Sequence, residues 1–344
     1  MTAYGYPERQ GLYDPALEKD SCGVGFVVNF KGRTSHDIIE QGLEILERLA
    51  HRGATGSDPN VGDGAGMLMQ IPLRFLSQVC GPLGITLPQE PGRLGVGMLF
   101  LPQDAKRREQ AEAIIAREIA AEGQSLLGWR TVPVDGSTLG KASKETMPFI
   151  RQVFVGTAEG VDPAAFERSL YVIRRQIEKG AEAEGLGELS IPSFSARTVV
   201  YKGMLTPAQT RSFFPDLSDP AMESALALVH SRYSTNTFPS WPLAQPFRIM
   251  AHNGEINTLS GNINWMRARE QNLQSPLFGE NLRKLFPVVN PTGSDSAIFD
   301  QVLEFLMATG RSLPHSMMMM IPEAWDGHQH MDPDLKAFYQ YHSI

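Results

Sequence analysis

The 344-residue sequence contains only two cysteines, Cys22 and Cys80. Two cysteines cannot form a disulfide framework, a four-cysteine zinc site or an iron–sulfur cluster within the chain. We therefore expect a reduced, cytoplasmic protein with no metal of its own. The 31 basic residues do not exceed the 38 acidic ones, which argues against general nucleic-acid binding.

Long apolar runs are also missing from the sequence. No stretch reaches the roughly 18 consecutive apolar residues of a transmembrane helix, and residues 1–21 lack the apolar centre of a secretion signal. Neither a Gly-x-Gly-x-x-Gly motif nor a P-loop is present. We therefore expect no membrane contact. Because both nucleotide-binding motifs are absent, the function must rest on other residues.

Strand-like and helix-like segments alternate along the chain. Short apolar or β-branched runs predict strands, and apolar residues at helical spacing predict helices. The expected strands are 23–30, 66–71, 94–101, 127–134, 149–155, 196–201, 225–229 and 247–251, and the expected helices are 36–50, 104–121, 162–184, 259–271 and 296–307. Residues 51–66 contain five glycines, and a loop of that length is usually functional or mobile.

Cys22 stands where a polar leader meets the first expected strand. That place fits an N-terminal nucleophile that is exposed when residues 1–21 are removed. A free α-amine titrates near ~7.7–8.0 and can act as the general base for its own thiol. The alternative is a small buried core residue, which is also the role that we expect for Cys80.

Three polar clusters follow expected strands or precede an expected helix. In H-S-R-Y-S-T-N-T (230–237), Arg232 presents a planar fork that suits a carboxylate. In A-H-N-G-E-I (251–256), the Asn253 amide beside the Gly254 N–H is a natural pair of oxyanion donors. In T-G-S-D-S (292–296), Asp295 can hold an ammonium group. Taken singly, each cluster also has a structural explanation: a salt-bridged arginine, an Asn-Gly turn, and an N-cap at Ser294 or Asp295.

Taken together, the motifs resemble the class II glutamine amidotransferase domain, and more closely the amino-terminal region of glutamate synthase large subunits. The matching stretches are D-S-C-G-V-G-F (20–26), L-A-H-R-G-A-T-G-S-D-P-N-V-G-D-G-A-G (49–66), H-S-R-Y-S-T-N-T-F-P-S-W (230–241), A-H-N-G-E-I-N-T (251–258) and M-M-M-I-P-E-A-W (318–325). The resemblance implies an α+β fold, the four-layer αββα sandwich of the N-terminal nucleophile (Ntn) hydrolases. It also implies a propeptide, residues 1–21, and one amidotransferase domain, residues 22–344, truncated at its C-terminal end.

By this resemblance, Cys22 attacks the side-chain amide of L-glutamine, so that ammonia and then glutamate are released. Asn253 and Gly254 match the oxyanion hole. Arg232 matches the residue that binds the substrate α-carboxylate, and Asp295 the one that holds its α-amino group.

Arg52 matches an arginine that helps to order the site near the nucleophile. The resemblance implies no cofactor within this chain. In the full-length parent it implies FMN and a [3Fe–4S] cluster, and synthase domains of the same polypeptide that use the ammonia to convert 2-oxoglutarate into glutamate. The parent would draw electrons from NADPH or NADH through a small reductase subunit, or from ferredoxin.

Three alternatives remain open on the sequence. One is another class II amidotransferase, although Asn236 follows Thr235 where amino-sugar enzymes have histidine. A second is an unprocessed fragment without catalytic activity. A third is a papain-type cysteine hydrolase, in which His230 or His252 would have to pair with Cys22.

Overall fold

The computed structural model describes residues 9–11, 23–234, 237–254, 256 and 258–343. The strands are β1 (Val24–Val28), β2 (Ala65–Gln70), β3 (Leu94–Leu101), β4 (Ser125–Thr131), β5 (Phe149–Gly156), β6 (Ser190–Ser195), β7 (Thr198–Gly203) and β8 (Leu226–Ser231). The α-helices are α1 (His36–Arg48), α2 (Leu73–Cys80), α3 (Ala105–Ala121), α4 (Lys141–Glu145), α5 (Pro163–Ala183), α6 (Pro207–Phe213), α7 (Leu259–Glu270), α8 (Asp295–Ala308), α9 (Leu313–Met320) and α10 (Pro333–His342). Short 3₁₀ helices are η2 (Leu49–Arg52), η3 (Gly81–Leu83), η4 (Pro215–Ser218) and η5 (Gly279–Leu285).

The strands form two antiparallel sheets, with the orders β1-β8-β2-β7 and β4-β5-β3-β6. In the first sheet, β8 lies between β1 and β2. His230 is paired with Val24 on one side and with Gly66 on the other. Because β1 and β8 are antiparallel, the start of β1 lies beside the end of β8.

Side chains of β3 alternate between two apolar cores, as the period of a strand requires. Val96, Met98 and Phe100 join a large core with residues of α1, β2 and β7. Leu99 and Leu101 instead face a second core, which α3 and α5 complete. Helices therefore pack against both sheets, and the described residues form an α+β arrangement with two antiparallel sheets.

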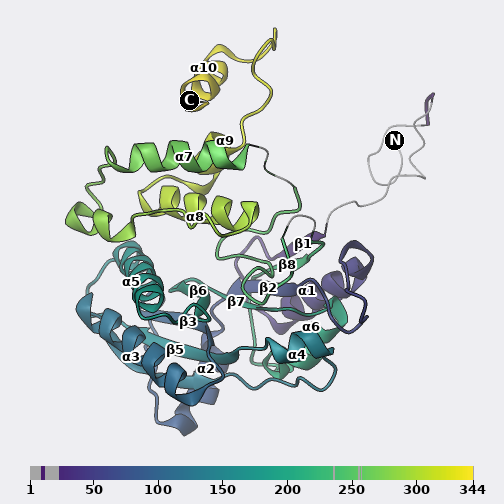
Figure 1. Ribbon diagram of the computed structural model, residues 1–344, viewed down its shortest axis with the longest axis vertical. Coiled ribbons are helices and arrows are strands. Elements are labelled where there is room, and N and C mark those ends of the chain that lie inside the picture. Colours follow the sequence, from purple (N-terminus) through teal and green to yellow (C-terminus); the bar gives the residue numbers. More distant parts are fainter. Residues whose placement is uncertain (1–8, 12–22, 235–236, 255, 257, 344) are drawn as a thin grey trace.

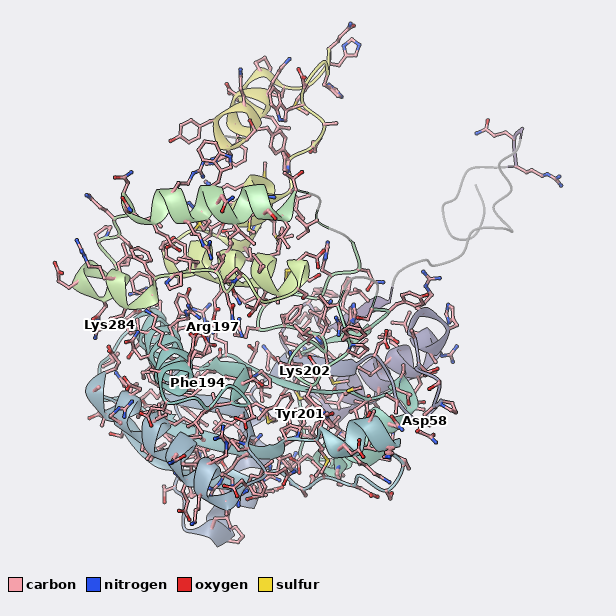
Figure 2. All side chains as sticks on the ribbon, in the orientation of Figure 1. Asp58, Phe194, Arg197, Tyr201, Lys202 and Lys284 are labelled. Atoms are coloured by element: carbon pink, nitrogen blue, oxygen red, sulfur yellow. The ribbon has the colours of Figure 1, made fainter. Side chains whose placement is uncertain are left out.

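Tyr201 on β7 belongs to a buried polar cluster that joins separate elements of the body (Figure 2). Arg130 of β4 donates two bonds to the Asp216 carboxylate, at 2.7 and 2.8 Å. The Tyr201 hydroxyl donates to Asp216 as well, over 3.1 Å. A buried ion pair with this many hydrogen bonds fixes how its elements meet.

The helices that follow β8 gather on one side of the sheets, with α10 farthest away (Figure 1). Tyr171 and Val172 of α5 pack against a third apolar core, to which α7, η5 and α8 contribute. A smaller core joins Met250, Phe299 and Leu303 to two methionines of α9, Met317 and Met320. The first sheet and this helical group thus flank the segment between β8 and α7.

Most of the expected elements are present, but several expectations were wrong. The expected strand 247–251 is not a strand, and the expected strand 127–134 is shifted to Ser125–Thr131. The sequence reading missed α2, α4, α6, α9, α10 and β6, which are each ten residues long or shorter. Ser35 stands at the N-cap of α1 without a capping side-chain bond, and its backbone pairs with Ser224.

In the part of the chain that the structure describes, no helix has both the length and the apolar character to cross a membrane.

Candidate active site

A cleft of about 740 Å³ opens where β8 ends. Its walls come from η2, from the end of β8 and the described residues that follow it, from described residues between Gln245 and Leu259, and from the start of α8. Its lining residues are His51, Arg52, Gly53, His230, Arg232, Tyr233, Ser234, Thr237, Gln245, His252, Asn253, Gly254, Ile256, Leu259, Gly293, Ser294, Asp295 and Ser296. Arg52, Arg232, Asn253, Gly254 and Asp295, which were all chosen from the sequence, therefore share one cleft. Cys22 lies outside the described residues.

Gly23, the residue that follows Cys22 in the sequence, lies beside Asn253, one of the residues that line this cleft. Its carbonyl oxygen accepts a hydrogen bond from the Ser231 N–H over 2.8 Å. A Cβ atom on Gly23 would overlap the Ser231 carbonyl oxygen and lie 3.0 Å from Asn253 Nδ2. The backbone thus reaches the Asn253 amide closely, one peptide bond after Cys22, and only glycine leaves room for this approach.

The Asn253 side chain is anchored by a buried histidine. His230 is 1% exposed, and its Nε2 atom lies 2.6 Å from Asn253 Oδ1. Burial lowers the pKa of His230 to about 4, so the ring is neutral at pH 7. Because an amide oxygen can only accept, Nε2 carries the proton and donates it. No described residue accepts a hydrogen bond from Asn253 Nδ2, which leaves this amide group available in the cleft.

Gly254 follows Asn253 and lies close to the ring of His252. A Cβ atom on Gly254 would be 2.8 Å from His252 Nε2. The ring is fixed by Ser296 Oγ, 3.0 Å from its Nδ1 atom, and by parallel stacking on Phe299. Gly254 itself is exposed, so it presents its backbone to the cleft without a side chain in the way.

Side chains rather than a neighbouring strand hold the backbone that leads to Asn253. The fully buried Asp300 carboxylate accepts from the backbone N–H groups of residues 248, 249 and 250. The Gln245 amide accepts from the His252 N–H at 2.8 Å and donates to the His252 carbonyl at 3.1 Å. These bonds replace a strand ladder, so the segment 247–251 satisfies its backbone without forming a strand, despite its apolar pattern.

Arg232 is the buried cation of the cleft, 6% exposed. Its backbone N–H donates to the Gly64 carbonyl, and its own carbonyl accepts from the Ala54 N–H. Nη2 donates to Thr237 Oγ1 over 2.7 Å, whereas Nη1 has no partner among the described residues. Burial lowers the pKa of Arg232, but an arginine remains charged at neutral pH.

Asp295, the first residue of α8, provides the opposite charge. Its Oδ2 atom accepts from the Ile256 N–H at 2.9 Å, and Oδ1 from the Ser296 N–H at 2.6 Å. Ser294 is the N-cap, because its hydroxyl accepts from the Ala297 N–H. Asp295 therefore connects the loop after Gly254 to α8. The charges of Asp63 and, to a smaller extent, Asp295 raise the pKa of Arg232 against the larger effect of burial.

Arg52 ends η2 and is half-buried at the rim of the cleft. The next residue, Gly53, packs so tightly against β8 that a Cβ atom would overlap Ser231 Oγ. From the same glycine-rich loop, the buried Asp63 carboxylate accepts from the Ser234 N–H over 2.6 Å. This loop is thereby joined to the segment that carries Arg232.

The structure adds residues that the sequence reading missed: Asp63, Gln245 and Asp300, and the contact of His230 with Asn253. No local pattern marks Asp300, which lies mid-helix in α8. His230 Nε2 contacts Asn253 Oδ1, and His252 Nδ1 contacts Ser296 Oγ. The papain-type alternative requires one of these histidines beside Cys22, which lies outside the described residues, so it stays an alternative. Cys80 is fully buried, and burial raises its pKa to about 11, as expected for a structural cysteine.

Comparisons with known proteins point to one family. The family model described as "Glutamine amidotransferases class-II" matches residues 22–344. The "Glutamate synthase [NADPH] large chain" of Bacillus subtilis is 51% identical over all of this chain and 22% of its own length. The Azospirillum brasilense protein of the same name is 42% identical over 96% of this chain and 22% of its length. A "Ferredoxin-dependent glutamate synthase, chloroplastic" of rice is 43% identical over 94% of this chain and 20% of its own length.

The chain thus spans about a fifth of the length of these relatives. The family match covers nearly the whole chain and begins at Cys22. The chain belongs to the class II glutamine amidotransferases.

Proposed function

We propose that this chain is the glutaminase part of a glutamate synthase, with Cys22 as its nucleophile. The observation that carries the proposal is the composition of one cleft. A buried arginine with a free Nη1, an aspartate and the Asn253–Gly254 pair line it, beside the residue that follows Cys22. These groups match the charges and the reacting amide of L-glutamine.

The zwitterionic end of glutamine would lie between Arg232 and Asp295. The free Nη1 of Arg232 donates to the α-carboxylate, which removes the cost of an unpaired buried donor. The α-ammonium group lies toward the Asp295 carboxylate, whose oxygens keep lone pairs beyond those used by the backbone N–H groups. This placement directs the side-chain amide of the substrate toward Asn253 and the nucleophile.

In the proposed reaction, removal of residues 1–21 gives Cys22 a free α-amine, which takes the thiol proton. The sulfur forms a bond to the amide carbon, and the negative oxygen is stabilised by the Asn253 Nδ2 group and the Gly254 N–H. The carbon–nitrogen bond then breaks, and the leaving nitrogen takes the proton and departs as ammonia. Water attacks the thioester, so that glutamate leaves and the thiol is restored.

The start of the family match at Cys22 supports the division into a propeptide, residues 1–21, and an amidotransferase domain, residues 22–344. We also propose the four-layer αββα arrangement of the Ntn hydrolases, which the two antiparallel sheets with helices on them support.

The names of the relatives support a larger enzyme of which this chain is one part. In that enzyme, we propose that ammonia passes to synthase domains of the same polypeptide, where FMN and a [3Fe–4S] cluster take part in making glutamate from 2-oxoglutarate. NADPH- and ferredoxin-dependent relatives both match this chain, so either electron donor fits. A cytoplasmic location is part of the same proposal.

The proposal is tested by measuring glutamate release from glutamine by the purified chain, with Cys22→Ala and Cys80→Ala as a matched pair. We expect release by the wild-type and Cys80→Ala proteins and none by Cys22→Ala. Equal rates for the wild-type and Cys22→Ala proteins would refute the proposal. Intact mass shows in the same samples whether residues 1–21 have been removed.

A further inference from the structure

We infer that His230 is a positioning residue of the oxyanion hole, because its Nε2–H holds the Asn253 amide with its NH2 group toward the reacting carbon. The inference rests on the proposed function and assigns a role to a histidine that the reaction itself does not use.

The hydrogen bond determines which end of the amide faces the substrate. Rotation of an asparagine amide by half a turn exchanges an acceptor oxygen for a donor NH2 group in nearly the same place. With Oδ1 toward the nucleophile, the oxygen would repel the oxyanion instead of stabilising it. His230 Nε2 lies 2.6 Å from Oδ1, and a neutral ring that donates from Nε2 can bind only this oxygen end.

His230 is rigid enough for this role. Its backbone pairs with Val24 of β1 and with Gly66 of β2. A Cβ atom on Gly42 of α1 would touch Ala227 and Val229, so these side chains face α1 and His230 faces the other way. Burial keeps the ring neutral, so one nitrogen is the donor.

Asn253 has little else to orient it. The residue is exposed, and the bond to His230 is the only hydrogen bond of its side chain among the described residues. The Cβ position of Gly23 lies 3.0 Å from Nδ2 and 3.3 Å from Oδ1, so the amide packs against the residue after Cys22. That packing fixes the position of the Asn253 amide, but it does not distinguish the Oδ1 end of the amide from the Nδ2 end.

The test compares His230→Gln with His230→Asn. A glutamine places its NH2 group near the position of Nε2, whereas an asparagine reaches only the position of Nδ1. We expect His230→Gln to keep kcat within about threefold. For His230→Asn we expect kcat to fall about 30-fold with KM almost unchanged, since one oxyanion donor is worth on the order of 10²–10³ in kcat. His36→Gln, far from the cleft, is the control for histidine loss.

A double-mutant cycle separates positioning from general damage. In an Asn253→Ala background the amide is gone, so His230→Asn should have no further effect on kcat. Equal losses in His230→Gln and His230→Asn, a change in KM rather than kcat, or full additivity with Asn253→Ala would each overturn the inference. Glutamate binding, measured by calorimetry, identifies any variant that has simply failed to fold.

A measurement without turnover keeps this inference distinct from the proposed function. In ¹⁵N-labelled protein, nuclear magnetic resonance should show His230 protonated at Nε2, with slow exchange of that proton in the wild type and faster exchange in Asn253→Ala. Protonation at Nδ1, or exchange that Asn253→Ala leaves unchanged, overturns the inference even in an active enzyme. An inactive wild-type protein with the expected Nε2 proton would instead contradict the proposed function.

Discussion

At the scale of single residues, Arg232 is the group that we propose binds the α-carboxylate of glutamine. A guanidinium that is 6% exposed and has one free nitrogen carries a large desolvation cost. A bound carboxylate offsets that cost and matches the geometry of the fork. The side chain is thus poised for an anionic ligand and pairs poorly with a neutral one.

We expect Arg232→Met to raise the KM for glutamine by about 10- to 100-fold with a smaller change in kcat. A hydrogen bond to a charged group is worth roughly 1.5–3 kcal/mol, and the α-carboxylate is bound alike in the ground and transition states. Steady-state glutamate release measures both constants. Arg48→Gln, an exposed arginine of α1, should leave them unchanged, and an unaltered KM in Arg232→Met would remove this arginine from the substrate site.

Gly23 offers a second test at the residue scale. A methyl group there overlaps the Ser231 carbonyl and presses on the Asn253 amide, so Gly23→Ala should lower kcat by at least about tenfold, because a small misplacement at a reacting centre is costly. Gly187→Ala is the matched control, since a Cβ atom at that position meets nothing within 4 Å. If both variants keep wild-type kcat, the start of β1 does not form part of the site.

The sequence predicted the residues of the cleft better than the contacts that position them. Arg232, Asn253 and Asp295 stand in polar clusters whose chemistry is visible in the residue types. The His230–Asn253 bond joins residues 23 positions apart and depends on where β8 ends, and the role of Asp300 depends on how α8 docks. Such contacts follow from the fold as a whole.

At the scale of elements, the segment 247–251 shows how an apolar pattern can mislead. Phe247 and Met250 are buried, as in a strand, but the neighbouring backbone groups are satisfied by Asp300 and Gln245. The short elements α2, α4 and α6 carry too few turns for a clear helical period, and β6 (S-I-P-S-F-S) contains a proline that argues against a strand.

We expect Asp300→Asn to weaken this segment. The amide replaces one accepting oxygen with a donor that faces backbone N–H groups, and it removes the buried charge beside Arg248. The free energy of unfolding should fall by about 3 kcal/mol, and kcat should fall with it because Asn253 lies three residues after Met250. Urea unfolding and glutamate release test both effects. Glu109→Gln on the exposed face of α3 is the control, and full stability in Asp300→Asn would contradict this role.

At the scale of the whole molecule, the alternation of strands and helices was readable from the sequence, and the partition of strands into two sheets was not. Sheet order depends on long-range pairing, such as β1 with β8, for which the chain has no local signal.

The buried position of Lys202 in β7 also has no local signal in the sequence. Its ammonium group donates to the carbonyls of Pro242 and Ala244, deep in the molecule (Figure 2).

Lys202 makes stability depend on pH. Burial lowers its pKa to about 7, from roughly 10.4 in an unfolded chain. Between these values the unfolded state binds more protons, so the free energy of unfolding should rise with pH across this window, by up to about 4 kcal/mol. Urea unfolding at pH 7 and pH 10 measures the rise, which should be smaller in Lys202→Met. Equal slopes in the two proteins would contradict the account of Lys202.

The central claim, that Cys22 becomes the N-terminal nucleophile of the glutamine cleft, is tested most directly by mass spectrometry after reaction with an electrophilic glutamine analogue. We expect a single adduct, on a Cys22 that has become residue one, with glutamine protecting it and Cys80 unmodified. An adduct on Cys80, or stoichiometric labelling of a chain that still carries residues 1–21, would contradict the claim.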